Sequence, residues 1–344
     1  MLIRLATAAD RTSWDDFVNN HPDGTVFHLW AWKSVVERAY GHRSHYLLAT
    51  ATPDGQEILG VLPVFEIKSL LFGHSLISVP FAELGGVLAA STAVAELLLE
   101  RAAALTVQVG AAYLELKNRQ PLPGLPTKSL YCNFSRPLLP TAEENLQAVP
   151  RKSRAMVRKG IQAGLRSEVG NHLFAEFYQL LARSYHQHGT PVFPRRFLAT
   201  YLEEFGDTAE VLLVRTADNQ PIAGVLTFYY RDRVMPYYAG SLHDYRHLAP
   251  NDFMYWELMR RGCERGYAVF DFGRSKQGTG SFAFKEHWGF APHPLAYQYR
   301  LNTATALPNL SPTNPRYRRK IELWRKMPFG LTKLVGPPLA KYLA

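Results

Sequence analysis

The sequence contains little cysteine and no long uncharged hydrophobic segment. Its only cysteines, Cys132 and Cys263, lie far apart and lack the C-x-x-C or His/Cys spacing of a zinc site or redox pair. We therefore predict neither a disulfide nor a bound metal. No stretch reaches the roughly 18 uncharged residues of a membrane-spanning helix, and residues 1–17 carry acidic and polar groups where a secretory signal needs an apolar core. A cytoplasmic protein is expected.

Several motifs of well-known enzyme classes are missing as well. The chain has no G-x-x-x-x-G-K-[ST] phosphate loop, no G-x-S-x-G nucleophile elbow and no H-E-x-x-H zinc motif. Neither cysteine has a histidine partner that the sequence indicates, so covalent catalysis is not expected. Direct attack of an amine on a carbonyl group is the simpler chemistry.

Hydrophobic and basic residues are what the sequence does contain. It is 47% hydrophobic and 12% aromatic over 344 residues, which is enough for the cores of two ordinary domains. The net charge of +10 is concentrated in two segments. Residues 151–166 hold six Lys or Arg and no acid, and residues 313–344 hold eight Lys or Arg and one acid. The remainder is slightly acidic, which excludes a uniformly basic, nucleic-acid-coating surface.

An internal repeat joins two distant parts of the chain. Residues 46–62 align with residues 211–226 with one gap, at Pro53, and Gly60 and Gly224 fall at the same place. Each segment consists of an apolar run, a turn of Asp-Gly or Asp-Asn, and a second apolar run. Because those turn residues tolerate positive φ, each segment is predicted to form a β-hairpin.

A second match follows in the same order. Residues 110–116 align with residues 266–272. Each of these two segments follows a predicted helix, at residues 93–109 and 252–265 respectively. In both copies a glycine suits the left-handed cap of the helix, and a buried strand is expected just beyond it.

The two matches predict an α/β fold with two tandem domains. We place the first domain at residues 1–148 and the second, which we expect to be catalytic, at residues 149–312. Residues 138–144 would link them, and a basic amphipathic tail would occupy residues 313–344.

The repeats differ after their last matched strand, and this difference predicts the site. The second copy continues through residues 271–290 with glycines at 273, 278, 280 and 289, whereas the first continues with residues 115–123 and lacks them. Open α/β sheets bind ligands at the C-terminal ends of their strands, and glycine lets the backbone approach a ligand closely. We therefore expect a functional loop in the second half.

Lys285 and Asp271 are the candidate catalytic residues of this loop. Lys285 lies between two Phe residues and Trp288, and its ammonium could stabilise negative charge on an attacked carbonyl. The alternative is an ordinary lysine whose stem packs on Trp288. Asp271 could orient an amine or cap the following turn. Phe284 and Arg274 are further substrate-binding candidates.

Tyrosine and arginine side chains upstream supply further candidates. Tyr237 and Tyr238 are adjacent on a predicted strand, so one should be in the core while the other faces the opposite side of the sheet. We expect Tyr238 to offer its hydroxyl to substrate as a catalytic group, with Tyr237 also binding substrate; a structural tyrosine is the alternative. Residues 186–201 should form a loop leading into a helix, with Arg196 and Tyr201 as acceptor contacts.

Each basic segment predicts an amphipathic helix. After Pro150, the basic residues, Lys152, Arg154 and Arg158 among them, cover less than half of a helical circumference, which suits binding of donor phosphates or simple solvation of that face. In the tail, cations alternate with apolar residues around Pro328. Such a helix could lie on anionic lipid or pack on the body of the protein.

The chain resembles the FemAB family of aminoacyl transferases, and more closely the FemAB-like proteins associated with PEP-CTERM/exosortase systems. The resemblance covers nearly the whole chain and is based on six segments in order, residues 27–32, 79–86, 150–159, 237–241, 266–273 and 284–289. It implies two tandem GNAT-type domains, with mixed central sheets, that form an amide on an acceptor amine.

The resemblance also implies candidate donors and acceptors. In the peptidoglycan branch the donor is aminoacyl-tRNA, whose end lies at the pair that matches Phe284 and Lys285. A second lysine of the family falls near Val36 here, with Lys33 close by, which is a departure from the peptidoglycan pattern. The PEP-CTERM association implies an exopolysaccharide setting, with an amino sugar as acceptor and an acyl-CoA as donor. No permanently bound cofactor is expected.

Two alternatives to a FemAB-like transferase stay open at this point. One is an acetyl-CoA-dependent N-acetyltransferase that acts on an amino sugar. The other is a non-catalytic adaptor that docks on polysaccharide-export machinery at the membrane surface through residues 313–344.

Overall fold

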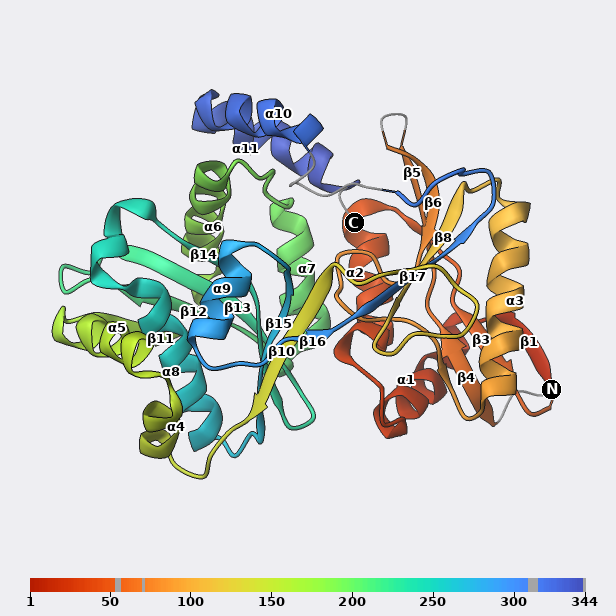
Figure 1. Ribbon diagram of the computed structural model, residues 1–344, viewed down its shortest axis with the longest axis horizontal. Coiled ribbons are helices and arrows are strands. Elements are labelled where there is room, and N and C mark those ends of the chain that lie inside the picture. The colour runs from red at the N-terminus through yellow and green to blue at the C-terminus, as the bar shows by residue number, and fades with distance from the viewer. Residues whose placement is uncertain (53–56, 70–71, 309–314, 343–344) are drawn as a thin grey trace. The chain divides into compact units, whose positions relative to one another are not determined.

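The computed structural model describes residues 1–52, 57–69, 72–308 and 315–342 (Figure 1). The chain divides into two compact units. Unit 1 comprises Met1–Leu130, Pro294–Leu310 and Lys341–Ala344, and unit 2 comprises Tyr131–His293 and Ser311–Ala340. This division differs from the predicted boundaries at 148/149 and 312/313, because strands on either side of those positions pair with sheets in the other part of the sequence.

Unit 1 contains two sheets covered by helices. The sheets have the strand orders β1-β3-β4-β7 and β2-β5-β6-β8-β17-β9. Leu98 of the long helix α3 and Leu47, Leu62 and Leu114 of the strands share one hydrophobic core. The elements are β1 (Leu2–Leu5), α1 (Arg11–Asn20), α2 (Trp30–Tyr40), β2 (Arg43–Ser44), β3 (Leu47–Thr50), β4 (Ile58–Leu62), β5 (Phe65–Ser69), β6 (Gly73–Ile77), β7 (Leu88–Ala89), α3 (Thr92–Gln108), β8 (Tyr113–Asn118), β9 (Thr127–Lys128) and β17 (Ala296–Leu301).

Unit 2 is built on one seven-stranded sheet with the order β11-β12-β13-β14-β15-β10-β16. Its strands are β10 (Tyr131–Pro137), β11 (Arg166–Val169), β12 (Ala209–Arg215), β13 (Pro221–Tyr230), β14 (Arg233–Ser241), β15 (Val269–Lys276) and β16 (His293–Pro294). Its helices are α4 (Ala142–Ala148), α5 (Arg151–Gln162), α6 (Phe174–His188), α7 (Arg195–Phe205), α8 (Pro250–Glu264), α9 (Gly280–His287), α10 (Pro315–Lys326) and α11 (Phe329–Ala340).

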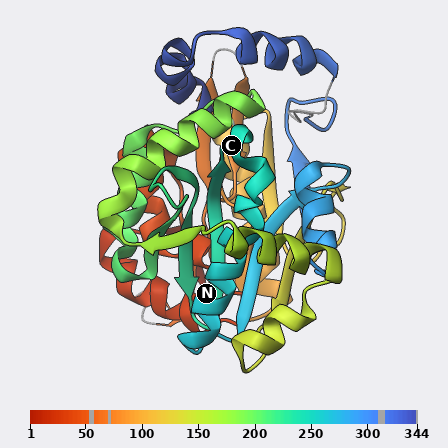
Figure 2. The same cartoon turned by 90° about the vertical axis from the view of Figure 1, so that its left-hand side faces the viewer.

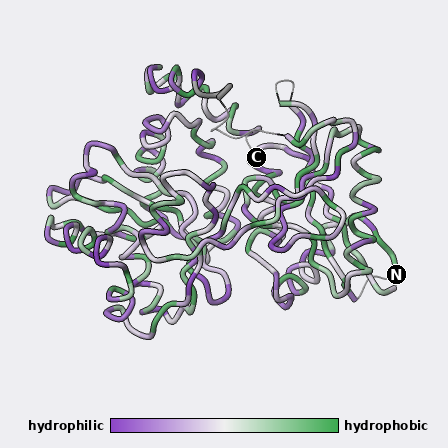
Figure 3. Tube along the Cα trace, viewed as in Figure 1, coloured by the Kyte–Doolittle hydropathy of each residue, from purple (hydrophilic) through white to green (hydrophobic). Residues whose placement is uncertain are grey.

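Helices cover both faces of the unit 2 sheet. Gly224 of β13 faces α6, where a Cβ atom would lie 3.1 Å from Phe177. The next residue, Val225, shares the hydrophobic core with Met254 of α8. Neighbouring residues of a strand point to opposite faces, so α6 and α8 lie on opposite sides of the sheet. Figure 3 shows hydrophobic residues concentrated along these central strands.

The structure confirms the hairpin repeat. The antiparallel pairs β3–β4 and β12–β13 place Ala49 opposite Gly60 and Leu213 opposite Gly224. A Cβ atom would come within 2.9 Å of Leu98 at Gly60 and within 2.7 Å of Leu213 at Gly224. Both glycines are thus required by close packing at the same position of the hairpin. The turn that holds Pro53 lies outside the described residues.

The helix caps repeat as well. Gly110 after α3 has φ +70° and Gly266 after α8 has φ +78°. In each copy the glycine N–H donates to the carbonyl three residues back, and the following N–H donates to the carbonyl five residues back. These are the bonds that end a helix at a left-handed residue, as the sequence predicts.

In each unit, the strand that pairs antiparallel with β8 or β15 is the one that follows the other repeat in sequence. β8 pairs with β6 in parallel and with β17 in antiparallel orientation. β15 pairs with β14 in parallel and with β10 in antiparallel orientation. β10 follows β8 in sequence but belongs to the sheet of β15, and β17 follows β15 but belongs to the sheet of β8. The two repeats have therefore exchanged their final strands.

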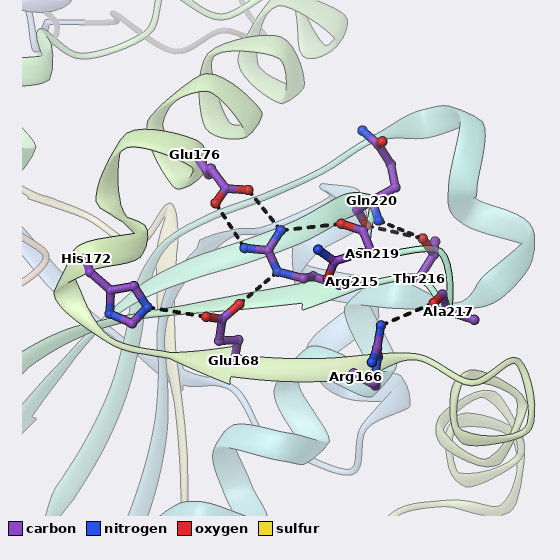
Figure 4. A network of polar contacts seen from close by, with 9 residues as sticks. All are labelled: Arg166, Glu168, His172, Glu176, Arg215, Thr216, Ala217, Asn219 and Gln220. Carbon is purple, nitrogen blue, oxygen red and sulfur yellow. Dashed lines mark hydrogen bonds and ion pairs between the residues drawn. The ribbon is translucent and has the colours of Figure 1, made fainter.

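An arginine network holds the first strands of unit 2 to α6 (Figure 4). The buried Arg215, at the end of β12, donates to Glu168 of β11 at 2.9 Å and to both carboxylate oxygens of Glu176 of α6 at 2.9 and 3.0 Å. Glu168 also pairs with His172 at 3.3 Å. The guanidinium lowers the pKa of both carboxyl groups. Three elements that are separate in sequence are thereby joined at one edge of the sheet.

The tail packs on unit 2. Helices α10 and α11 both contact α6, and they lie beside it in Figure 2. Trp324 and Thr332 are buried in this contact, and the Arg325 guanidinium donates to the carbonyl of His188 at 3.1 Å. Of the two expected arrangements, packing on the body is present. No helix among the described residues is long and apolar enough to cross a bilayer.

Candidate functional site

The parallel strands β14 and β15 separate at the centre of the unit 2 sheet. They pair only at Arg233 with Val269 and at Val234 with Phe270, although β14 continues to Ser241 and β15 to Lys276. Along the rest of their length each strand pairs only on its outer side, β14 with β13 and β15 with β10. The facing backbone edges beyond Phe270 are therefore not joined by strand pairing.

A β-bulge in β14 changes the expected directions of the two tyrosines. Leu226 of β13 lies opposite Tyr238 and Thr227 lies opposite Pro236, so Tyr237 is the extra residue of the bulge. The rings of Tyr237 and Tyr238 contact each other at 4.9 Å. The expectation that they face opposite sides of the sheet is therefore wrong, because a bulge breaks the period-two alternation.

The two tyrosines differ in burial. Tyr238 is buried among aromatic rings, and its hydroxyl donates to that of the equally buried Tyr201 at 3.3 Å. Burial raises the pKa of Tyr238, and the positive charge of Arg274 acts in the opposite direction. Tyr237 is the half-buried member of the pair. Tyr238 and Tyr201 thus lie in the core beside the opening, and Tyr237 is closer to solvent.

Lys285 lies on helix α9 and not in a loop. The residue is 8% exposed. Its ammonium donates to three successive carbonyls of β15, those of Phe272 at 2.7 Å, Gly273 at 2.9 Å and Arg274 at 3.0 Å. The rings of Phe134 and Phe272 lie 5.4 and 5.9 Å from Nζ. The surroundings are aromatic as expected, but these two rings come from β10 and β15 and are not the sequence neighbours on which the expectation was based. Because an ammonium has three N–H groups, these contacts give Lys285 a role in holding the backbone of β15.

Asp271 lies within β15 and bonds to its own strand at an irregularity in the pairing with β10, whereas the expected cap was of a turn after the strand. Its Oδ1 accepts from the backbone N–H of Gly273 at 2.9 Å and from the amide of Asn133 at 2.8 Å. Oδ2 lies 3.5 Å from Arg233. The carboxylate is buried and directed at these partners. It supports the irregular backbone at Gly273, where φ is +68° and the register with β10 shifts; a role in orienting an amine stays a prediction.

The remaining candidates lie on the surface or beside the aromatic core. Arg274 stacks on Tyr131 at 4.8 Å and half-buried Phe284 packs on Tyr255 of α8 at 5.6 Å. Arg196 is exposed on α7, which begins at Arg195 after the end of α6 at His188. The segment 186–201 is thus mostly helical.

Helix α5 presents its basic residues to solvent. Lys152 and Arg158 are exposed, and Arg154 donates to the carbonyl of Gln147 at 2.9 Å. The opposite face, with Val157 and Gly160, is buried, and α5 packs against α8. The predicted amphipathic helix is confirmed, and phosphate binding by its outer face stays a prediction.

A histidine pair at the C-terminal end of β14 was not predicted. His243 follows β14 and its ring contacts that of His188 at the end of α6, 4.9 Å away. Burial lowers the pKa of His243, with Arg246 and His188 as further causes. Its Nε2 is buried and has no hydrogen-bond partner among the described residues. The sequence offers only the spacing of His243 and Arg246 after an apolar strand, which is too common to single out.

Unit 1 holds a cavity at the corresponding end of its own sheet. The cavity measures about 150 Å³ and lies at the C-terminal end of β8, lined by Thr25, His28, Gly86, Lys117, Asn118 and Arg119 among others. By the alignment of Gly110 with Gly266, Asn118 corresponds to Arg274. The sequence predicts no function for these residues, because the glycines that distinguish the second copy are absent from the first.

Two buried or paired lysines belong to unit 1. Lys117 is 1% exposed and donates to the carbonyls of Val79 and Ala82, both at 3.2 Å. Lys33 pairs with Glu37 at 2.8 Å, and Val36 is buried in the core. Unit 1 therefore has, in Lys117, a second lysine that binds backbone carbonyls.

Comparison with protein families gives one match. Residues 148–286 match the model of the acetyltransferase (GNAT) domain. This segment is similar to GNAT-type domains. The match covers unit 2 from α5 to α9 and supports the expected acyltransferase class; GNAT domains use acyl-CoA as a co-substrate without a permanently bound cofactor. A search of curated proteins found no match.

Solved structures share the fold along most of the chain. A FemX crystal structure has a TM-score of 0.65 at 14% identity, over 88% of this chain and 98% of that one. L-PGS from Bacillus licheniformis has a TM-score of 0.55 at 13% identity, over 95% and 97%. A tandem GNAT protein from the clavulanic acid biosynthesis pathway has 0.54 at 10% identity, over 89% and 99%. The predicted α/β fold of two GNAT-like domains is confirmed.

Proposed function

We propose that unit 2 forms an amide by moving an acyl or aminoacyl group from a donor onto an acceptor amine. The observation that carries this proposal is the separation of β14 and β15 inside the segment that matches the GNAT domain. Strand edges that do not pair with each other offer N–H and C=O groups to an extended ligand. A donor chain that lies between the strands would pair with them and bring its carbonyl to the sheet's centre.

The reaction would be a direct transfer. The neutral amine attacks the donor carbonyl, the new C–N bond forms, and the C–S bond of a thioester or the C–O bond of an aminoacyl ester breaks. The attacking nitrogen loses a proton to solvent, and the leaving thiol or hydroxyl takes one up. Backbone N–H groups at the separated strands would stabilise the oxyanion of the intermediate.

The protein side chains would position this reaction. Lys285 acts as a positioning residue, because it holds the carbonyls of residues 272–274 and so shapes the β15 edge. The positive charge of Arg274 on β15 acts on Tyr238 of β14, where it lowers the pKa of the hydroxyl against the effect of burial. We propose half-buried Tyr237, together with Arg274, as the substrate contacts, with Tyr238 and Tyr201 as the rigid wall behind them.

Two basic features suit two kinds of donor. On α5, Lys152 and Arg158 are exposed and Arg154 is half-buried, and together they give the outer face of the helix a positive charge that suits the backbone of an aminoacyl-tRNA. Beyond β14, the Arg246 guanidinium supplies positive charge, and the rings of His188 and His243 beside it supply N–H donors, which suits the phosphates of an acyl-CoA. By the family resemblance, the acceptor would be an amine of a cell-envelope or exopolysaccharide precursor, such as an amino sugar.

Thermal stabilisation by the donor tests the proposal and separates the two donors. A ligand at about 100 times its Kd stabilises the native state by about 2.7 kcal/mol, so the melting temperature should rise with either acetyl-CoA or aminoacyl-tRNA. His243→Ala should remove the shift caused by acetyl-CoA, and Lys152→Glu with Arg158→Glu should remove that caused by tRNA. Lys68→Glu, at an exposed position of β5 in unit 1, is the control. The absence of any shift with both donors would contradict the proposal.

A further inference from the structure

The outer face of α11 is apolar and exposed. Leu331, Leu334 and Val335 are 45%, 74% and 37% exposed. On the opposite side of the same helix Thr332, Gly336 and Ala340 are buried. A helix that is apolar on all sides is normally enclosed by protein or lipid. Here one side is enclosed, and the other is in solvent.

Helix α10 adds cations to this apolar surface. Arg319 and Lys326 are exposed, and Leu323, one turn from each, is 64% exposed. At 100° per residue these three side chains lie on one side of the helix, opposite the buried Trp324. Glu322 is the only acidic residue between residues 313 and 344. We call Leu323, Leu331, Leu334 and Val335, with Arg319 and Lys326, the tail face.

Contacts with α6 fix the direction in which the tail face points. The hydroxyl of Thr332 bonds with the ring of His186 at 3.1 Å, and Lys333 donates to Gln179 at 2.9 Å. On the other tail helix, α10, the Arg325 guanidinium donates to the carbonyl of His188 at the end of α6. Gly189 also meets α10 closely, since a Cβ there would lie 2.6 Å from Ile321. The tail is thus docked by one side, and its other side is held outward as a preformed surface.

We propose that the tail face binds the surface of an anionic lipid bilayer. Exposed leucines insert their side chains into the region between headgroups and acyl chains, and neighbouring cations pair with lipid phosphates. The composition favours lipid because the tail offers leucine and cations with almost no carboxylate or amide groups to bind a folded protein partner. This inference is independent of the transfer reaction proposed for unit 2.

Vesicle sedimentation of the full-length protein tests the proposal. Wild-type protein should bind vesicles of phosphatidylcholine with phosphatidylglycerol, bind pure phosphatidylcholine vesicles more weakly, and dissociate as salt is raised. Leu331→Asp with Leu334→Asp should weaken binding about tenfold or more. Lys326→Glu should weaken it about fivefold. Val107→Asp, an equally exposed position on α3 of unit 1 at 65%, and Lys68→Glu are the matched controls and should bind like wild type.

Three results would overturn the proposal. The first is vesicle binding that the leucine variant leaves unchanged, provided that its melting temperature equals that of wild type. The second is absence of vesicle binding together with a dimer, seen by sedimentation velocity, that the leucine variant dissociates, which would make the face an interface between copies of this chain. The third is absence of vesicle binding together with tRNA binding that Lys326→Glu weakens.

Discussion

At the scale of single residues, two buried lysines show what sequence can and cannot reveal. The Phe and Trp residues near Lys285 in sequence predict apolar surroundings, yet the rings beside its ammonium are Phe134 and Phe272, which are distant in sequence. Its three carbonyl partners are not local either, because they depend on the irregularity of β15 at Gly273 and on the place of α9 beside that strand. Lys117 makes the same kind of contact in unit 1 and has no comparable motif around it.

Asp10 gives a residue-scale prediction with a defined pH dependence. Its carboxylate accepts two bonds from Arg4, at 2.6 and 2.8 Å, and one from the N–H of Thr7 at 2.7 Å. These contacts, that of Arg4 first, lower the pKa of Asp10 far below its ordinary value. We expect Asp10→Asn to reduce the free energy of unfolding by about 1.5–3 kcal/mol at pH 7.

The effect of Asp10 should disappear in acid. Because folding lowers its pKa, the unfolded chain takes up a proton at about pH 3.9 while the native state does not. The stabilisation is complete above that pH and declines as the pH falls toward the native pKa. Urea unfolding of both proteins at pH 7 and pH 3 should show a smaller difference at pH 3. An equal difference at both values would refute the assignment.

At the scale of secondary-structure elements, local sequence signals predict regular hairpins and helix ends well, but they do not predict irregularities such as bulges. Turn residues and apolar runs predicted both hairpins, and glycine predicted both helix caps. The bulge at Tyr237 was not predicted, although Pro236 is a signal for it, because proline has no N–H to donate to a neighbouring strand and is found in inner strands mainly at bulges. Its cause is the pairing with β13, which shifts between Leu226 and Thr227. The regular alternation therefore misplaced one of the two rings, and the catalytic role expected of Tyr238 stays a prediction.

The paired hairpin glycines yield an element-scale prediction. Gly60→Ala and Gly224→Ala each place a Cβ atom 3.1 Å or less from a backbone carbonyl as well as against side chains. Overpacking of this kind costs about 1–3 kcal/mol, so each variant should melt at a lower temperature than wild type. Gly280→Ala, where no atom lies within 4 Å, is the matched control. Calorimetry that finds the three variants equally stable would show that the close packing is absent.

At the scale of the whole molecule, the exchange of strands explains why the domain boundaries differ from those predicted. Matching repeats indicate two units but not which strand completes each sheet, since that pairing is between residues far apart in the chain. Gln298 of β17 bonds to Asn118 and Leu122 of unit 1. Phe134 of β10 is fully buried in the core of unit 2. Neither contact can be predicted from neighbouring residues in the sequence.

Fragments of the chain test this exchange. A fragment of residues 149–344 lacks β10, so it loses Phe134 from its core and leaves β15 without its antiparallel partner. Removal of one buried Phe side chain alone costs about 3–5 kcal/mol. We expect circular dichroism to show no cooperative melting of this fragment, whereas residues 131–344 should melt cooperatively. Equal melting of the two fragments would mean that β10 is dispensable for unit 2.

The central claim is that unit 2 catalyses amide formation at the separated strands β14 and β15, and the most direct measurement is product formation by two lysine variants. Mass spectrometry would follow transfer from acyl-CoA and aminoacyl-tRNA donors to amino-sugar acceptors. Lys285→Met and Lys117→Met each remove an ammonium that binds carbonyls, so both should lose stability. Only Lys285→Met should lower the turnover of folded protein, by about a hundredfold as expected for a misplaced site. Wild-type turnover in Lys285→Met, or an equal loss in Lys117→Met, would contradict the account.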